Sequence, residues 1–106
     1  MEFIETPIFT QEIRRLLPDV EYRWLQLALL LRPEAGDLIP GGGGLRKIRW
    51  KTVGGGKRGG LRVIYFWERP DRIYLLLPYS KREQGDLTPA QTKLLAGLAK
   101  EWLHER

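Results

Sequence analysis

The chain has 106 residues, of which 42% are hydrophobic and 29% are charged, and its net charge at pH 7 is +5. This length suits a single domain with one two-layered core, and we expect one domain over residues 1–106. The composition excludes wholesale disorder, and the absence of cysteine excludes disulfides, thiol chemistry and Cys-based zinc sites. No secretion signal and no bilayer-length apolar run is present, so we expect a soluble, cytoplasmic protein.

The first third of the chain predicts one strand followed by two helices. Residues Glu2–Glu5 have the pattern of a short strand. Thr6-Pro7 marks the start of a helix that should run to residue 17, with threonine as the N-cap and proline at the first helical position. Asp19 is expected to cap a second helix over residues 20–32. The two helices should form a hairpin.

The middle of the chain predicts a meander of three antiparallel strands. Residues 33–44 are rich in glycine and should form a connecting loop. The strands are expected at Leu45–Lys51, Leu61–Trp67 and Ile73–Tyr79. The second of them is almost continuously apolar, which is typical of a central strand covered on both faces.

A final helix is predicted after Thr88, which forms a capping box with Gln91 around a proline at the first helical position. Its apolar stripe should close over the sheet or bind a partner. The expected order is β-α-α-β-β-β-α. This order gives an α+β fold, a small antiparallel sheet with two N-terminal helices and a C-terminal helix, the helices packed mainly on one face.

The excess positive charge is confined to the stretch from Leu38 to Trp67, which contains no Asp or Glu. Removing its seven basic residues from the 18 in the chain leaves 11, against 13 acidic residues. A local concentration of cations attracts polyanions, so RNA or DNA is the first partner to consider. The seven residues are Arg46, Lys47, Arg49, Lys51, Lys57, Arg58 and Arg62.

Strand alternation places Lys47, Arg49 and Lys51 on one face of the first meander strand, with Ile48 and Trp50 on the other. Three cations without an interleaved acid form either a solvated face or a surface for an anionic partner. We favour the second interpretation because the cations are concentrated here.

Arg62 is the only charge in an otherwise apolar strand. It either pairs with a carboxylate such as Glu68 or lies at the mouth of a cleft, where a ligand phosphate supplies the opposite charge; we favour the cleft. Tyr79, Lys81 and Arg82 follow the next strand and should converge on the same side of the sheet. Tyr79 either packs in the core or stacks an unpaired base.

The segment Gly54–Gly60 satisfies the spacing of a dinucleotide fingerprint, but it opens a strand where that fingerprint opens a helix. It is either a flexible connector or backbone that approaches phosphates, with Lys57 and Arg58 as reaching cations. His104 is the only histidine, and it is expected in the last turn of the final helix, where it interacts favourably with the C-terminal end of the helix. The sequence therefore offers no two-histidine ribonuclease set and no carboxylate cluster for a metal.

The segments Gly36–Pro40, Gly43–Arg49 and Gly56–Tyr65 together resemble the HigB-like branch of the RelE toxin superfamily. The similarity extends over nearly the whole chain, and the motifs are specific in combination. The resemblance implies a bacterial type II toxin that enters the A site of the small ribosomal subunit and cuts mRNA during translation. It also implies a small antiparallel sheet with two N-terminal helices and a C-terminal helix.

The same resemblance implies site residues. Lys47 and Arg49 match a pair of alternating cations, Arg62 matches a central-strand arginine, and Lys81-Arg82 matches a Lys-Arg pair before the last helix. Thr88 stands where type members have a tyrosine implicated in cleavage, so either Tyr79 substitutes for it or the chemistry uses Lys and Arg alone. The expected catalytic residues are Lys47, Arg49, Arg62, Lys81 and Arg82, and the expected RNA-binding residues are Arg46, Lys51, Lys57, Arg58 and Tyr79.

The expected reaction is attack of a ribose 2′-hydroxyl on the adjacent phosphate, with no metal and no cofactor. Arg62 and Arg82 would stabilise charge on the phosphoryl oxygens. Lys47 or Lys81 would accept the 2′-hydroxyl proton, because crowding by like charges favours a neutral amine.

Two alternatives stay open on sequence alone. One is a non-catalytic RNA-binding or ribosome-binding module that uses the same basic face. The other is a ParE-like toxin that acts on gyrase, which the cations Lys47, Arg49 and Arg62 disfavour. By resemblance, the protein partner is a cognate antitoxin with a helix-turn-helix DNA-binding part, which would dock around Trp102 on the last helix.

Overall fold

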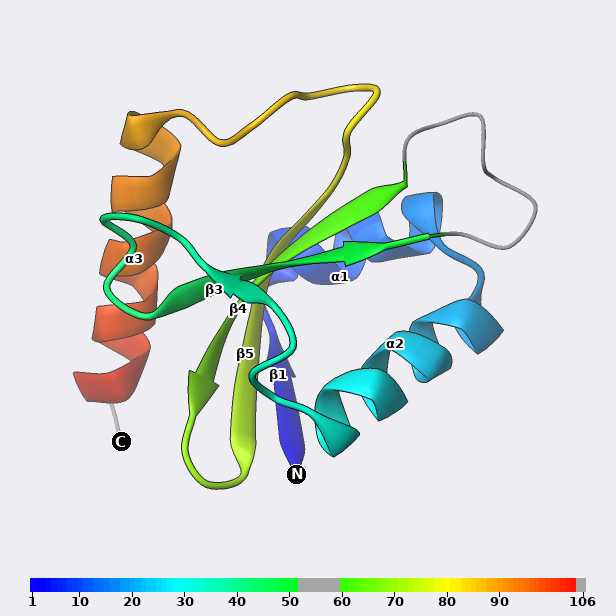
Figure 1. Ribbon diagram of the computed structural model, residues 1–106, viewed down its shortest axis with the longest axis horizontal. Helices are drawn as coiled ribbons and strands as arrows, with labels where there is room; N and C mark the ends of the chain where they lie inside the picture. Colours follow the sequence, from blue (N-terminus) through cyan, green and yellow to red (C-terminus); the bar gives the residue numbers. More distant parts are fainter. Residues whose placement is uncertain (52–59, 105–106) are drawn as a thin grey trace.

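The computed structural model describes residues 1–51 and 60–104, which form a five-stranded sheet with three helices. The strand order in the sheet is β1-β5-β4-β3-β2, and helices lie on both sides of it (Figure 1). The elements in chain order are β1 (Glu2–Glu5), α1 (Pro7–Leu16), α2 (Asp19–Leu31), β2 (Asp37–Leu38), β3 (Leu45–Trp50), β4 (Leu61–Glu68), β5 (Arg72–Ser80) and α3 (Pro89–His104).

The sheet is mixed, which corrects the prediction of a purely antiparallel sheet. Strands β2 to β5 pair with their neighbours in antiparallel fashion, but β1 runs parallel to β5. The two-residue strand β2 was predicted as part of a loop. It pairs Asp37 with Lys47 and Leu38 with Arg46 at the outer edge of β3.

The two N-terminal helices form where the sequence predicts them, but the second is capped differently. In α1 the Thr6 side chain accepts a hydrogen bond from the backbone N–H of Phe9 at 3.0 Å, as expected of an N-cap. In α2 the N-cap position belongs to Pro18, and Asp19 is already the first helical residue. Asp19 therefore makes no cap, although its charge suits the positive end of the helix dipole.

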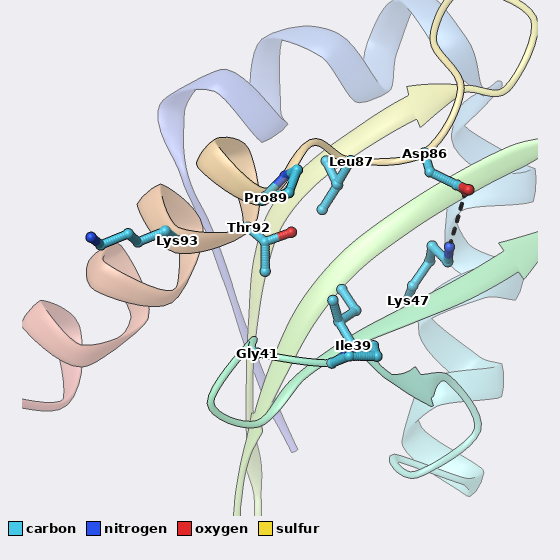
Figure 2. Close-up of a pocket in the computed structure, with 9 residues that line it drawn as sticks. Ile39, Gly41, Lys47, Asp86, Leu87, Pro89, Thr92 and Lys93 are labelled. Atoms are coloured by element: carbon cyan, nitrogen blue, oxygen red, sulfur yellow. Dashed lines mark hydrogen bonds and ion pairs between the residues drawn. The ribbon is translucent and has the colours of Figure 1, made fainter.

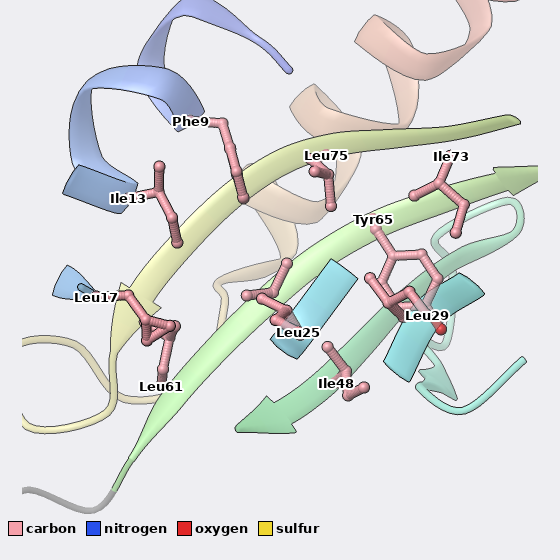
Figure 3. Close-up of a cluster of buried hydrophobic side chains, with 11 residues drawn as sticks. Phe9, Ile13, Leu17, Leu25, Leu29, Ile48, Leu61, Tyr65, Ile73 and Leu75 are labelled. Carbon is pink, nitrogen blue, oxygen red and sulfur yellow. The ribbon is translucent and has the colours of Figure 1, made fainter. Parts of the chain in front are cut away.

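One hydrophobic core lies between the α1–α2 layer and the sheet (Figure 3). The helices contribute residues at helical spacing, and the strands contribute alternate residues, so that each element buries one face. Among the described residues, this core contains Phe9, Ile13, Leu17, Leu25, Leu29, Ile48, Leu61, Val63, Tyr65, Ile73 and Leu75.

A second core lies on the opposite face of the sheet, under α3, so the helices do not pack mainly on one face as predicted. It is built from Leu45, Ile64, Leu76, Tyr79, Leu95 and Ala99. The ring of Trp102 packs on that of Tyr74 with centroids 4.9 Å apart. The last helix therefore closes over the sheet, and the nearly continuous apolar sequence of β4 follows from its cover on both faces.

A bulge in β5 lets that strand serve both cores. Ile64 pairs with Leu77, whereas Tyr65 pairs with Leu75, so Leu76 is an extra residue in the ladder. Leu76 and Leu77 consequently both pack on the α3 side. The carbonyl of Leu76 accepts a hydrogen bond from the Thr6 hydroxyl at 2.8 Å, which supplies a partner for the disrupted ladder.

The connection from α2 to β3 is fixed by a close approach at Gly36. The N–H of Gly36 donates to the Tyr65 hydroxyl at 2.8 Å, and that hydroxyl donates to the carbonyl of Pro33 at 2.7 Å. In addition, the Arg46 guanidinium donates to the carbonyls of Gly36 and Glu34 at 2.8 and 3.2 Å. These contacts hold the loop against β3 and β4.

Candidate functional site

Three of the predicted catalytic cations lie on one face of the sheet, as strand alternation predicts. Arg49 is directly opposite Arg62 on the neighbouring strand, and Arg62 is opposite Tyr79 on the next. Lys47 is opposite Ile64. Directly opposed residues share a face, and both Ile64 and Tyr79 belong to the core under α3, so all three cations are on the α3 side.

The ends of three strands bring further cations to the same end of the sheet. Lys51 follows the last residue of β3, and the backbone N–H of Lys81, just after β5, donates to the carbonyl of Gly60 at 3.3 Å. Lys51, Lys81 and Arg82 are exposed. We call this set the basic cluster: Lys47, Arg49, Lys51, Arg62, Lys81 and Arg82.

One residue predicted to bind RNA, Arg46, lies away from this cluster. Arg46 is opposite Tyr65, so it projects from the other face of the sheet, where it holds the loop around Gly36. Lys57 and Arg58 lie outside the described residues. A structural role for Arg46 was not foreseen, because its partners are backbone carbonyls of a distant loop.

Arg62 is buried at the start of β4, and Glu68 is not its partner. The Glu68 carboxylate accepts hydrogen bonds from Arg72 at 3.4 Å and from Tyr74 at 3.2 Å. It lies six residues further along the strand, a separation of about 20 Å. The alternative in which Glu68 neutralises Arg62 is therefore wrong.

From the sequence, Tyr79 could either pack in the core or stack an unpaired base. The structure packs it in the core under α3 with 6% of the residue exposed, which leaves no open ring face for a base. Its hydroxyl has no hydrogen-bond partner among the described residues. Burial raises the pKa of this phenol, the negative charge of Asp86 adds to the effect, and the positive charge of Arg62 opposes it. Tyr79 is therefore a neutral, protonated side chain beneath the basic cluster.

A carboxylate beside the predicted catalytic lysine was not predicted from the sequence. The ammonium of Lys47 lies 3.5 Å from the Asp86 carboxylate (Figure 2). The Lys47 side chain is 25% exposed and that of Asp86 is 90% exposed. The charge paired with Lys47 is thus an acid and not another cation, which removes the argument that like-charge crowding makes this lysine a base.

A pocket of about 500 Å³ opens beside this pair, between the loop after β2 and the start of α3 (Figure 2). Its walls are mostly apolar, with the charged pair at one side. No motif in the sequence predicts the pocket, since its residues come from segments about 40 positions apart. The residues that line it are Ile39, Pro40, Gly41, Lys47, Asp86, Leu87, Pro89, Thr92 and Lys93.

Side-chain contacts fix both ends of the segment that carries Lys81, Arg82 and Asp86. Arg15 on α1 binds both carboxylate oxygens of Glu83, at 2.8 and 3.0 Å, and this pairing lowers the pKa of Glu83.

At the other end of that segment, the predicted capping box is confirmed. The Thr88 hydroxyl accepts from the N–H of Gln91 at 3.1 Å, and the Gln91 side chain accepts from the N–H of Thr88 at 3.0 Å. Thr88 therefore caps α3, at the position where type members of the resembling family have a tyrosine.

Within residues 1–51 and 60–104, no group of three or more His, Cys, Asp or Glu side chains is arranged to hold a metal ion. In the same part of the chain, no helix has the length and apolarity needed to cross a membrane.

The fold and the basic cluster define a small α+β protein suited to a polyanionic partner. A family model described as the RelE toxin of the RelE/RelB toxin-antitoxin system matches residues 35–106, which is more than half of the chain and includes the whole basic cluster. The chain belongs to the RelE toxin family. It is therefore the toxin of a toxin-antitoxin system, and its partner is a cognate antitoxin.

Proposed function

We propose that this toxin is a ribosome-dependent mRNA endoribonuclease of the HigB-like branch, which cuts mRNA in the ribosomal A site in the cytoplasm and thereby inhibits translation. Toxins of its family are generally endoribonucleases. The observation that carries the proposal is the placement of Lys47, Arg49 and Arg62 on one sheet face, with Lys81 and Arg82 at the same sheet end. Such a set suits a phosphodiester whose negative charge increases during the reaction.

The proposed reaction is an internal transfer that consumes no water and uses neither metal nor cofactor. The 2′-oxygen of the ribose forms a bond to phosphorus while the bond from phosphorus to the 5′-oxygen breaks. The products are a 2′,3′-cyclic phosphate and a free 5′-hydroxyl. One proton leaves the 2′-hydroxyl and one proton reaches the 5′-oxygen, so a base and an acid are required.

The Lys47–Asp86 pair supplies groups for both proton transfers. We propose that the exposed Asp86 carboxylate accepts the 2′-hydroxyl proton, in place of the lysine base that the sequence suggested. Lys47, 3.5 Å away, stabilises the developing charge and donates the proton to the leaving oxygen. Arg49 and Arg62 bind the phosphoryl oxygens, for which the planar guanidinium is well suited.

The test is an assay with translating ribosomes, a defined message and mapping of new 5′ ends. Lys47→Ala and Arg49→Ala should each lower the cleavage rate by about 100-fold or more while ribosome binding changes little, because the lost interactions act in the transition state. Lys100→Ala, an exposed cation on α3, is the matched control and should cleave at the wild-type rate.

Asp86→Asn in the same assay separates the two candidate bases. It keeps the size of the side chain but removes the proton acceptor, so a rate near wild type would leave Lys81 as the base. Cleavage by neither wild type nor variants, with the toxin still bound to ribosomes, would identify a non-catalytic binding module. Inhibition of gyrase with intact messages would identify the ParE-like alternative.

A further inference from the structure

Helix α2 carries two apolar stripes on opposite sides, and the protein covers only one of them. Leu25 and Leu29 are fully buried against the sheet. On the other side, four large apolar residues are between 48% and 72% exposed. At 3.6 residues per turn these four lie within an arc of about 60°, roughly opposite the buried pair. They are Val20, Trp24, Leu27 and Leu31, and we call them the outer stripe.

The outer stripe has the geometry of a helix-binding surface. Its members are separated by four, three and four residues, which is the spacing of contact positions in paired helices. A soluble helix that is apolar on both sides normally has a partner on both. Single exposed apolar residues are common, but four on one side of a 13-residue helix form a continuous surface.

We propose that the outer stripe of α2 binds an amphipathic helix of the cognate antitoxin. The family requires such a protein partner. Arg23 is exposed and is a surface neighbour of both Val20 and Leu27, three and four residues away. A carboxylate on the bound helix would pair with this cation at the edge of the stripe.

The proposed docking surface is remote from the basic cluster. Helix α2 covers the sheet face opposite α3, whereas Lys47 and Asp86 lie on the α3 side (Figures 1 and 2). It also precedes residue 35, where the match to the family begins. The docking surface therefore lies outside the matched residues, and it differs from the site around Trp102 expected from sequence, where the ring already packs on Tyr74.

Calorimetric titration of the toxin with its purified cognate antitoxin tests the proposal. Trp24→Glu and Leu27→Glu place a negative charge in the stripe and should each weaken binding by about 30-fold or more, the loss expected at the centre of an interface. The matched control is Leu94→Glu, which changes an apolar residue on α3 that is 66% exposed. This variant should bind within about threefold of wild type.

A second measurement uses the wild-type toxin, so that it does not depend on how the variants fold. Amide chemical shifts recorded with and without antitoxin should change most along residues 19–31. Changes confined to α3 or the basic cluster, or equal loss of affinity in the Leu94 control, would overturn the proposal. So would a toxin dimer, seen by sedimentation in the absence of antitoxin, that Trp24→Glu dissociates. Because these experiments measure binding, a failure of the ribonuclease proposal leaves their outcome unchanged.

Discussion

At Gly36 the backbone passes so close to β3 and β4 that hydrogen is the only side chain that fits. A Cβ atom there would lie 2.8 Å from a ring carbon of Tyr65, 2.9 Å from its hydroxyl and 3.0 Å from the carbonyl carbon of Lys47. The same hydroxyl is bonded to both Gly36 and Pro33. Any displacement at Gly36 is thus transmitted to the strand that carries Lys47.

Gly36→Ala is expected to destabilise the protein by about 1–3 kcal/mol, because the methyl group overpacks a rigid ring and backbone. Urea denaturation followed by circular dichroism measures the change. Gly97→Ala is the control, since Gly97 is exposed on α3 with no atom within 4 Å of its added Cβ. That change should stabilise the helix by about 0.5–1 kcal/mol, and a similar effect at both positions would contradict the close-contact argument.

Side-chain alternation is a local property, and this decides which site residues were predictable. Lys47, Arg49 and Arg62 could be placed on one face because a strand has a period of two and their strands were recognised. Asp86 was missed because its partner is 39 positions away in an irregular segment, where no periodicity relates the two. For the same reason the hydrogen bonds of Arg46 to a loop could not be read from the sequence.

Among the elements, those with strong local signals were predicted and the others were not. The two proline-started helices and the three meander strands appear within about one residue of their expected bounds. Strand β2 was missed because it has two residues among glycines. The parallel pairing of β1 with β5 and the position of α3 on the second face depend on contacts between distant segments, which local patterns do not encode.

The Arg15–Glu83 pair joins an element of the first layer to the segment that presents Lys81 and Arg82. Arg15 lowers the pKa of Glu83 below its unfolded value of 4.5. The stabilising effect of this pair is therefore complete above about pH 5 and is lost as the pH falls through the folded-state pKa. The pair thereby holds the segment after β5 in place against α1.

Acid titration followed by amide chemical shifts tests this role of Glu83. Between about pH 5 and pH 3 the amides of residues 81–86 should shift as the segment detaches from α1. In Glu83→Gln they should have the detached shifts at every pH, and in Glu101→Gln, an exposed change on α3, they should behave as in wild type. Identical titrations in wild type and Glu83→Gln would rule out the tether.

The molecule as a whole holds three tyrosines in a state that resists ionisation. Burial is the largest cause of a raised pKa at Tyr22, Tyr65 and Tyr79. The folded protein therefore binds these protons more tightly than the unfolded chain, whose tyrosines titrate near pH 10. Their contribution to stability is complete below that pH and is lost as the pH rises through the folded-state pKa values.

We expect an alkaline unfolding transition above about pH 10, in which tyrosinate absorbance increases over the same pH range as the circular dichroism signal is lost. Tyr79→Phe should make the stability fall less steeply with pH, because one raised group is removed. It should also cost little stability at neutral pH, because the Tyr79 hydroxyl has no hydrogen-bond partner among the described residues. Tyrosinate absorbance that rises well before unfolding would contradict the assignment.

The parallel pairing of β1 with β5 also sets an order of events during synthesis. The Thr6 hydroxyl and the Leu76 carbonyl that it binds are 70 positions apart, so the first strand has no sheet to join until β5 has been made. Chains grow from the N-terminus, and pairing between distant segments is slow. The outer stripe of α2 is consequently made well before the basic cluster is assembled, and an antitoxin that binds there would meet the nascent toxin before the toxin acquires its activity.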